Sequence, residues 1–221
     1  MTTAIQEKKI LTAEEYLQME RTGLREKIGK HEFFNHKLIF MAGASNNHNL
    51  VTKNLVYTLE HQVRQNRTQH LVYAQDMRTI SHLPHKNYFY PDVEIVEGSP
   101  LFDDEKKDVL VNPTLIIEVL SDTTESFDRG DKFKSYRNIP TFIEYILVSQ
   151  ENKCLEQFYK NEQGKWEIGE VVTEGTLKLK TLPFELTIED VYFNIEIQSN
   201  KKESFQTASG MTLFFYLKYK F

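Results

Sequence analysis

Two acidic residues stand in strand-like stretches of the sequence, where a lone carboxylate is out of place. Asp92 follows a proline in the run YFYPDVEIV (88–96), and Glu118 lies inside the aliphatic run LIIEVL (115–120). A continuous apolar run is typical of a strand that is covered on both faces. An ionised carboxylate buried there costs several kcal/mol unless a cation, a metal ion or hydrogen-bond donors hold it. The sequence therefore predicts that something charged or polar meets Glu118.

Two interpretations of this acid pair remain open on the residues alone. Asp92 and Glu94 alternate with apolar residues and share one face of their strand, which could be the solvent face of an edge strand, as the nearby Pro91 favours. Glu118 could belong to a structural ion pair. Two carboxylates on neighbouring strands would instead suit Mg²⁺, which takes oxygen ligands and is held by one or two carboxylates plus substrate phosphate. Such an ion polarises a phosphate and lowers the pKa of an attacking water.

A basic residue that could complete such a site occurs in the stretch FDRGDKFKSYR (127–137). Asp128, Lys132 and Tyr136 are spaced by four and share one face of the predicted helix. Lys134 lies about 200° around the helix from Lys132, so at most one of the two lysines faces the site. The alternative interpretation is an exposed Asp–Lys pair beside a packed tyrosine.

His48 lies near the start of a predicted helix at 47–64, capped by Ser45 or Asn46. The helix carries an apolar residue at every fourth position, which predicts one buried stripe: Val51, Leu55, Leu59 and Val63. His48 falls on this buried side, where it either caps the core or lines the site.

The remaining patterns predict the elements that position these residues. Helical and strand-like stretches alternate, which indicates an α/β or α+β domain. A helix begins at a capping box formed by Thr12 and Glu15. We expect a hairpin at 31–41, strands at 71–78, 88–96, 114–120 and 142–148, a helix at 126–137, and a C-terminal meander of short strands at 154–160, 166–172 and 176–180. Glu32 in the hairpin and Asp76 in the first strand are weaker site candidates, since either could lie on a solvent face.

The segments YPDVEIV and NPTLIIEVLSDTTESFDRGDKFKSYRNIPTFIEYILV resemble the Uma2 (DUF820) family of restriction-endonuclease-like proteins. The resemblance extends over roughly residues 11 to 193 and includes the upstream stretch HEFFNHKLIFMAGASNNHNLVTKNL. It implies a PD-(D/E)xK nuclease fold, in which a mixed central sheet is flanked by helices, with the C-terminal meander as an addition.

The resemblance also implies roles for the candidate residues. Asp92 and Glu118 match the two acids of the pattern and would hold the metal together with a backbone carbonyl, that of Val119. Leu120 stands where the general pattern has its lysine, and Lys132 in the following helix matches the position that takes over this role. Five further residues match family positions and would support the site: Glu32, His48, Asp76, Asp128 and Tyr136.

The expected function is that of a metal-dependent endonuclease that uses Mg²⁺ or Mn²⁺ to hydrolyse nucleic acid, with DNA as the expected substrate. One alternative is a nucleic-acid-binding or regulatory module that has the nuclease fold but no catalytic activity. Such a module would bind nucleic acid without metal-dependent turnover. Another is a hydrolase that uses its two carboxylates as acid and base, as glycosidases do, and stays active in a chelator.

Composition limits these alternatives further. A length of 221 residues suits one domain, expected at 1–194, followed by a tail at 195–221 that is either poorly ordered or adds a strand to the sheet. The net charge of −5 argues against a protein that coats nucleic acid, yet a nuclease remains compatible because bound cations offset acid locally. A single cysteine excludes an intramolecular disulfide and fits the cytoplasm. We expect no membrane-spanning segment, and a homodimer is the expected assembly.

Overall fold

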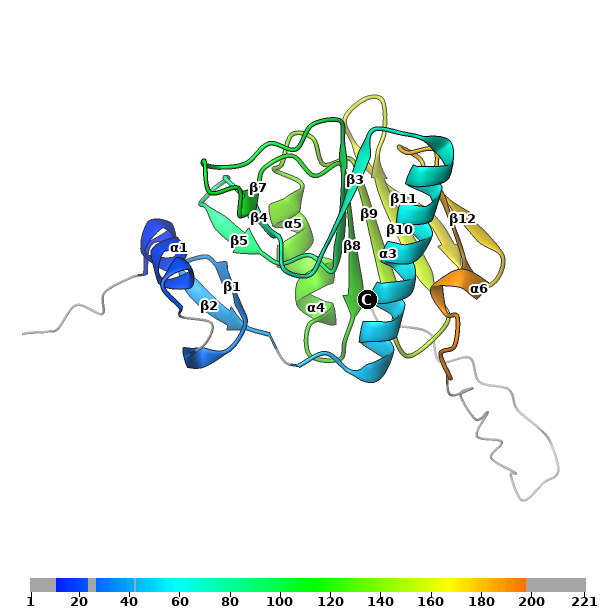
Figure 1. The fold of residues 1–221 in the computed structure, drawn as a ribbon, viewed down its shortest axis with the longest axis horizontal. Coiled ribbons are helices and arrows are strands. Elements are labelled where there is room, and N and C mark those ends of the chain that lie inside the picture. The colour runs from blue at the N-terminus through cyan, green and yellow to red at the C-terminus, as the bar shows by residue number, and fades with distance from the viewer. Residues whose placement is uncertain (1–10, 24–26, 42, 198–221) are drawn as a thin grey trace, which may run out of the picture.

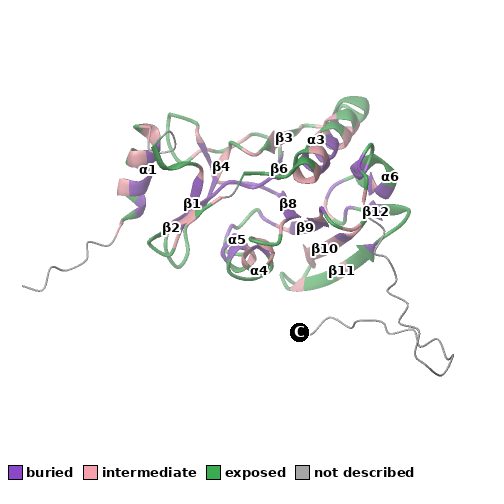
Figure 2. Cartoon of the chain, turned by 90° about the horizontal axis from the view of Figure 1, so that it is seen from below, coloured by how far each residue is buried: buried purple, intermediate pink, exposed green. Residues whose placement is uncertain are grey.

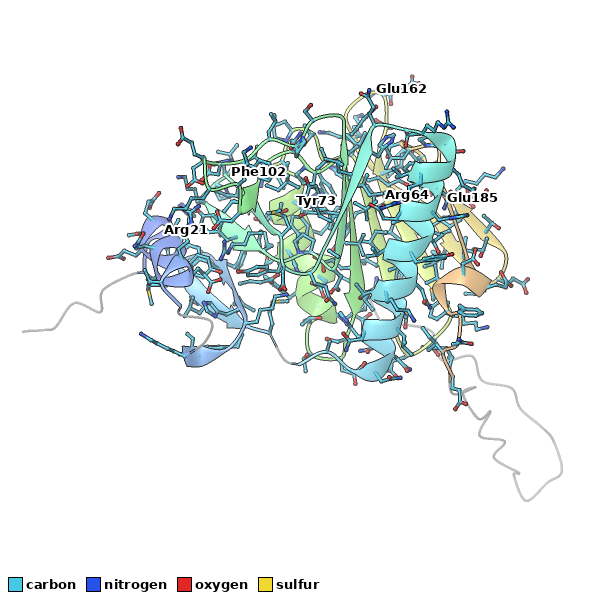
Figure 3. The ribbon with its side chains drawn as sticks, in the orientation of Figure 1. Arg21, Arg64, Tyr73, Phe102, Glu162 and Glu185 are labelled. Atoms are coloured by element: carbon cyan, nitrogen blue, oxygen red, sulfur yellow. The ribbon has the colours of Figure 1, made fainter. Side chains whose placement is uncertain are left out.

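The computed structural model describes residues 11–23, 27–41 and 43–197 (Figure 1). Most of the predicted tail at 195–221 lies outside the described residues. In the described part, Ile195 is 9% exposed and belongs to the largest hydrophobic cluster. Charged side chains such as Arg64 and Glu162 project outward from the surface (Figure 3). No helix in the described ranges is long and apolar enough to cross a membrane.

Helices and strands alternate along the first two thirds of the chain, and strands dominate the last third. The elements in chain order are α1 (Ala13–Arg21), β1 (His31–Phe34), β2 (Lys37–Phe40), α3 (Asn46–Asn66), β3 (His70–Ala74), β4 (Arg78–Ser81), β5 (Asn87–Phe89), β6 (Val93–Glu97), β7 (Val109–Leu110), β8 (Leu115–Leu120), α4 (Glu125–Phe127), the π-helical turn η1 (Asp128–Lys132), α5 (Phe133–Tyr136), β9 (Glu144–Ser149), β10 (Leu155–Lys160), β11 (Trp166–Val172), β12 (Thr176–Lys178), β13 (Glu185–Thr187) and α6 (Ile188–Val191).

The strands form a six-stranded sheet in the order β11-β10-β9-β8-β6-β3, a five-stranded sheet in the order β2-β1-β5-β4-β7, and a β12–β13 pair. The six-stranded sheet is mixed, because β8 and β9 run parallel while the other neighbours are antiparallel. Helix α3 covers one face of this sheet, and the continuous helical segment α4–η1–α5 covers the other (Figure 2). The predicted fold class, a mixed sheet flanked by helices, is confirmed.

Helix α3 forms as its apolar pattern predicts. Val51, Leu55, Leu59 and Val63 are all buried against the six-stranded sheet. The Ser45 side chain accepts a hydrogen bond from the His48 N–H at 3.0 Å, which satisfies one of the unpaired donors at the helix start. The cap therefore fixes where the helix begins, and with it the position of His48.

Replacing Ser45 by alanine is expected to lower the free energy of unfolding by about 1 kcal/mol, since the helix loses its N-cap acceptor. Ser45→Asp should recover most of the loss, because aspartate caps equally well but cannot donate to Gln150 as the Ser45 hydroxyl does. Urea unfolding of both variants tests this, with the exposed Ser126→Ala as the control. An unchanged midpoint for Ser45→Ala would show that the cap does not stabilise α3.

Two stretches that were each predicted as one strand, 71–78 and 88–96, each form two strands. The stretch 88–96 divides into β5 and β6, which belong to different sheets, and Tyr90–Asp92 form the crossing between them. Pro91 explains the break, because proline lacks the N–H that an inner strand must donate. The stretch 71–78 divides likewise into β3 and β4, with Gln75 in the left-handed region at φ 45°. The two crossings lie side by side, since the Gln75 N–H donates to the Asp92 carbonyl at 3.1 Å.

The predicted C-terminal meander is present but is divided between two sheets. Strands β10 and β11 extend the six-stranded sheet beyond β9, while β12 pairs with β13. The hairpin at β1–β2 is confirmed, and its two turn residues, Asn35 and His36, take positive φ values of 48° and 64°. The capping box of Thr12 and Glu15 at α1 is confirmed as well.

Candidate active site

The site lies where strands β6 and β8 separate. Their pairing ends at Val93 opposite Ile117, and β8 continues to Leu120 beyond that pair. The Val119 N–H therefore has no partner on β6, and it donates to the Asp92 carboxylate at 2.9 Å instead. The crossing at Tyr90–Asp92 thus opens the edge of β8 and places an acid in the opening.

Glu118 joins Asp92 across this opening and is only 2% exposed. One of its carboxylate oxygens accepts from the Asp92 N–H at 3.3 Å. The other accepts from the Tyr136 hydroxyl at 2.9 Å and lies 2.9 Å from the Lys132 ammonium. Burial raises the pKa of Glu118 well above its usual value. The charge of Lys132 lowers this pKa in part, and the charges of the neighbouring acids raise it further. The charged and polar partners that the sequence predicted for Glu118 are thus Lys132 and Tyr136.

Lys132 lies at the centre of a cluster of acids. Its ammonium is 2.9 Å from the carboxylate of Glu32 and 3.3 Å from that of Asp128, in addition to its contact with Glu118. Burial lowers the pKa of Lys132, but the three carboxylates outweigh it and hold the pKa well above the usual value. Lys132 is therefore a cation, and Lys134 of the same helical segment is exposed, as the predicted helical spacing allows.

His48 contacts the outer side of Asp92. Its Nε2 lies 3.2 Å from the Asp92 carboxylate, and its side chain is 14% exposed. Burial lowers the pKa of His48, but the hydrogen bond to Asp92 and the charges of Asp92 and Asp128 raise it by more, so the net shift is upward. The helix stripe and the Ser45 cap thus deliver His48 to the opening and not to a purely apolar core.

Seven of the predicted site residues come together in this one place: Glu32, His48, Asp92, Glu118, Asp128, Lys132 and Tyr136. Asp76 does not join them. It lies in the turn between β3 and β4, its side chain is 67% exposed, and it pairs with Lys30 at 3.4 Å. The left-handed Gln75 ends β3 before Asp76, so Asp76 takes the solvent-facing position that the sequence had left open.

Glu94, two residues after Asp92, lies apart from the cluster. It is 1% exposed and accepts a short hydrogen bond from the Thr79 hydroxyl, while its other oxygen has no hydrogen-bond partner among the described residues. Burial raises the pKa of Glu94 to about 8, against the opposing hydrogen bond from Thr79. Glu94 is thus a neutral acid at neutral pH.

This shift predicts a pH dependence of stability. An unfolded chain releases the Glu94 proton near pH 4.5, whereas the folded chain keeps it up to about pH 8. The folded state binds more protons between these values, so stability falls as pH rises, by up to about 1.4 kcal/mol per pH unit. In urea unfolding across the range, Glu94→Gln should reduce the slope of stability against pH by this contribution, and Glu97→Gln, an exposed change on the same strand, should keep the wild-type slope. Parallel profiles for wild type and Glu94→Gln would contradict the assignment.

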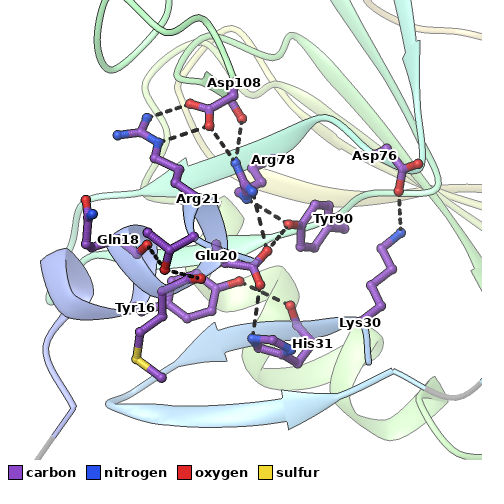
Figure 4. Close-up of polar contacts among 12 residues, drawn as sticks. Tyr16, Gln18, Glu20, Arg21, Lys30, His31, Asp76, Arg78, Tyr90 and Asp108 are labelled. Atoms are coloured by element: carbon purple, nitrogen blue, oxygen red, sulfur yellow. Dashed lines mark hydrogen bonds and ion pairs between the residues drawn. The ribbon is translucent and has the colours of Figure 1, made fainter. Parts of the chain in front are cut away.

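The sequence did not reveal a second polar cluster beside the site (Figure 4). Tyr90, which precedes Pro91 and Asp92, donates its hydroxyl to Glu20 and accepts from Arg78 at 2.7 Å. Glu20 also pairs with His31 at 3.2 Å. These residues come from α1, β1, β4 and the β5–β6 crossing, so no local spacing links them. The Tyr90 N–H donates to Glu32 at 3.0 Å and connects this cluster to the site.

The donor set determines which metal the site suits. Within the described ranges, no three His, Cys, Asp or Glu side chains converge in the manner of a metal site. The chain offers instead two carboxylates at the opening, on Asp92 and Glu118, and three buried acids, Glu32, Glu118 and Asp128, face a single lysine. An oxygen-only set with few protein ligands and excess negative charge fits Mg²⁺, which keeps several waters.

The sequence is similar to known proteins over most of its length. Residues 13–192 match the profile of the Uma2 family, which is described as "Putative restriction endonuclease". The chain belongs to the Uma2 family. Two uncharacterized proteins of Synechocystis sp. (strain PCC 6803) are similar to it: one is 38% identical over 76% of this chain and 90% of its own length, and the other is 30% identical over 82% and 91%.

A solved structure shares the Uma2 fold of this chain. It is a crystal structure from Anabaena variabilis described as a "putative nuclease belonging to DUF820", and it matches with a TM-score of 0.64 at 16% identity. The match covers 82% of this chain and 97% of that one. At this identity the likeness shows a shared fold, and the predicted family is confirmed by the profile match.

Proposed function

We propose that this Uma2 chain is a metal-dependent endonuclease that hydrolyses phosphodiester bonds of DNA. The observation that carries the proposal is the opening between β6 and β8, where Asp92 and Glu118 meet beside the buried ammonium of Lys132. Family membership supports a nuclease, and the oxygen-only donor set supports a hard divalent cation.

Asp92 and Glu118 would hold the cation, Mg²⁺ or Mn²⁺, together with the backbone carbonyl of Val119. The N–H and the carbonyl of one strand residue point to the same side, and the Val119 N–H points to Asp92. The carbonyl therefore faces the same opening. When bound, the ion would polarise the scissile phosphate and lower the pKa of the attacking water.

Lys132 would stabilise the negative charge that develops on the phosphate. Its raised pKa keeps it protonated, which suits a fixed cation and does not suit a general base. Glu32 and Asp128 hold its ammonium beside Glu118. A charge that is positioned before the reaction needs no reorganisation during it.

Two residues would orient the acids. The Tyr136 hydroxyl donates to the Glu118 oxygen that also contacts Lys132, so it fixes the rotation of that carboxylate. His48 holds Asp92 from the opposite side. These are positioning residues, and their replacement should reduce cleavage less than replacement of either acid.

Removal of the metal is the test of the proposal. Supercoiled and linear DNA of mixed sequence are incubated with the protein in Mg²⁺, in Mn²⁺ and in excess chelator. We expect nicking or cutting in either metal, none in chelator, and recovery when Mg²⁺ is restored. Glu118→Gln should remain inactive under all conditions.

Other outcomes would point elsewhere. Full activity in chelator would contradict the metal-dependent mechanism. DNA binding without cleavage in any metal would favour the alternative of a nuclease-fold module that binds nucleic acid without catalysis. Equal cleavage by wild type and Glu118→Gln would show that the activity does not arise from this site.

A further inference from the structure

Lys30, which precedes β1, holds its ammonium in a defined position near the candidate active site. The ammonium donates to the Gln75 carbonyl at 2.6 Å and lies 4.7 Å above the centre of the Tyr90 ring. It pairs with Asp76 at 3.4 Å (Figure 4). The side chain of Lys30 is 22% exposed and that of Asp76 is 67% exposed, so the pair reaches solvent.

Gln75 and Tyr90, which hold the Lys30 ammonium, also contact residues of the candidate active site. The Gln75 N–H donates to the Asp92 carbonyl at 3.1 Å, and the Tyr90 N–H donates to the Glu32 carboxylate at 3.0 Å. Lys30 is therefore a cation at the rim of the opening, whereas Lys132 is buried inside it.

We propose that Lys30 binds a backbone phosphate of the nucleic-acid substrate, and that Asp76 competes with this phosphate for the ammonium. The inference rests on the proposed nuclease function and adds a substrate contact to it. Asp76 thereby acts on substrate binding through Lys30, and it is not a metal ligand.

The electrostatics of the opening favour this role. A polyanion that approaches Asp92 and Glu118 meets their negative charge, and a cation at the rim offsets the repulsion. The Gln75 carbonyl and the Tyr90 ring keep the ammonium in place, so little side-chain freedom is lost on binding. Replacing Asp76 by phosphate as the partner of Lys30 costs little free energy, because an exposed ion pair contributes only about 0.2 to 1 kcal/mol.

The salt dependence of binding tests the proposal. Fluorescence anisotropy gives the Kd of a labelled DNA duplex over a series of KCl concentrations, with Ca²⁺ in place of Mg²⁺ and the DNA checked to be intact by gel. Loss of one phosphate contact should reduce the slope of log K against log salt by about 0.9 in Lys30→Gln. Asp76→Asn should tighten binding by roughly two- to fivefold at low salt, which is the equivalent of one exposed pair.

The matched control is Lys180→Gln. Lys180 also pairs with an exposed acid, Glu170 at 3.0 Å, but it lies beyond β12. Lys180→Gln should keep the wild-type slope of log K against log salt. The thermal melting temperature should be the same for Lys30→Gln, Asp76→Asn and Lys180→Gln. If wild type binds and Lys30→Gln keeps its slope, the proposal for Lys30 is overturned while the nuclease function stands. If wild type binds no duplex or single strand, the proposed function itself fails, and this inference with it.

Discussion

Asp92→Asn is expected to lose metal-dependent cleavage by roughly a thousandfold while keeping its fold. A bound metal stabilises the transition state by several kcal/mol, and each 1.4 kcal/mol corresponds to about a factor of ten in rate. The asparagine amide oxygen can still accept the Val119 N–H, and its shape matches the aspartate that is 8% exposed in the opening. The substitution therefore removes the charge that would bind the metal and little else.

Single-turnover cleavage rates and thermal melting together test this expectation. Asp131→Asn is the control, because Asp131 is an exposed aspartate next to Lys132 in the same helical segment. It should cleave at the wild-type rate. An Asp92→Asn protein that is folded and cleaves as fast as wild type would contradict the role given to Asp92.

Lys132→Met is expected to lower the free energy of unfolding by about 3 to 5 kcal/mol, the cost of breaking a buried ion pair from one side. Lys132 is 3% exposed, and its removal leaves Glu32, Glu118 and Asp128 buried without their shared cation. The three carboxylates must then take up protons or remain charged at high cost. Urea unfolding at neutral pH gives the value.

Lys134→Met provides the matched control for this change. Lys134 is two residues away in the same segment and is exposed, so its replacement should alter stability by no more than about 0.5 kcal/mol. Adding Glu32→Gln to Lys132→Met should recover part of the loss, since one buried charge is removed with its cation. Equal losses for Lys132→Met and Lys134→Met would contradict the buried position of Lys132.

Local context identified Glu118 because a buried carboxylate is physically improbable, whereas the role of Asp92 was implied by the family resemblance. Glu118 lies in an aliphatic strand that is covered on both faces, and that context predicts a cation, a metal ion or hydrogen-bond donors beside it. The four-residue spacing of Asp128, Lys132 and Tyr136 then identified the helix face that supplies the cation. Both features are local in the chain, and the structure places these side chains together as the spacing predicts.

The opening itself could not be predicted from local pattern. The strand-like composition continues through 88–96, although the chain leaves one sheet and enters another at Tyr90–Asp92. Pro91 was the only signal, and it indicated an edge strand equally well. Strand β5 lies between β1 and β4, whereas β6 lies between β3 and β8. These pairings depend on contacts between residues that are distant in the sequence.

Asp76 and Lys30 illustrate the same limit. Asp76 is a weaker candidate in the sequence, which leaves a solvent-facing position open, and the turn at Gln75 directs it toward solvent and Lys30. The local sequence around Lys30 carries no signal of function, because a lysine before a hairpin is common. Its position becomes informative only when Gln75 and Tyr90, which are 45 and 60 residues further along the chain, are seen beside it.

Calorimetric titration of Mg²⁺ and Mn²⁺ into wild type and into the Asp92→Asn/Glu118→Gln variant tests the central claim most directly. Glu94→Gln, which changes a buried acid outside the cluster, serves as the control. We predict saturable binding to wild type and to Glu94→Gln, and no binding to the double variant. Identical heats for wild type and the double variant would contradict the claim, because Asp92 and Glu118 would then be structural acids that hold Lys132 and Val119 and bind no metal.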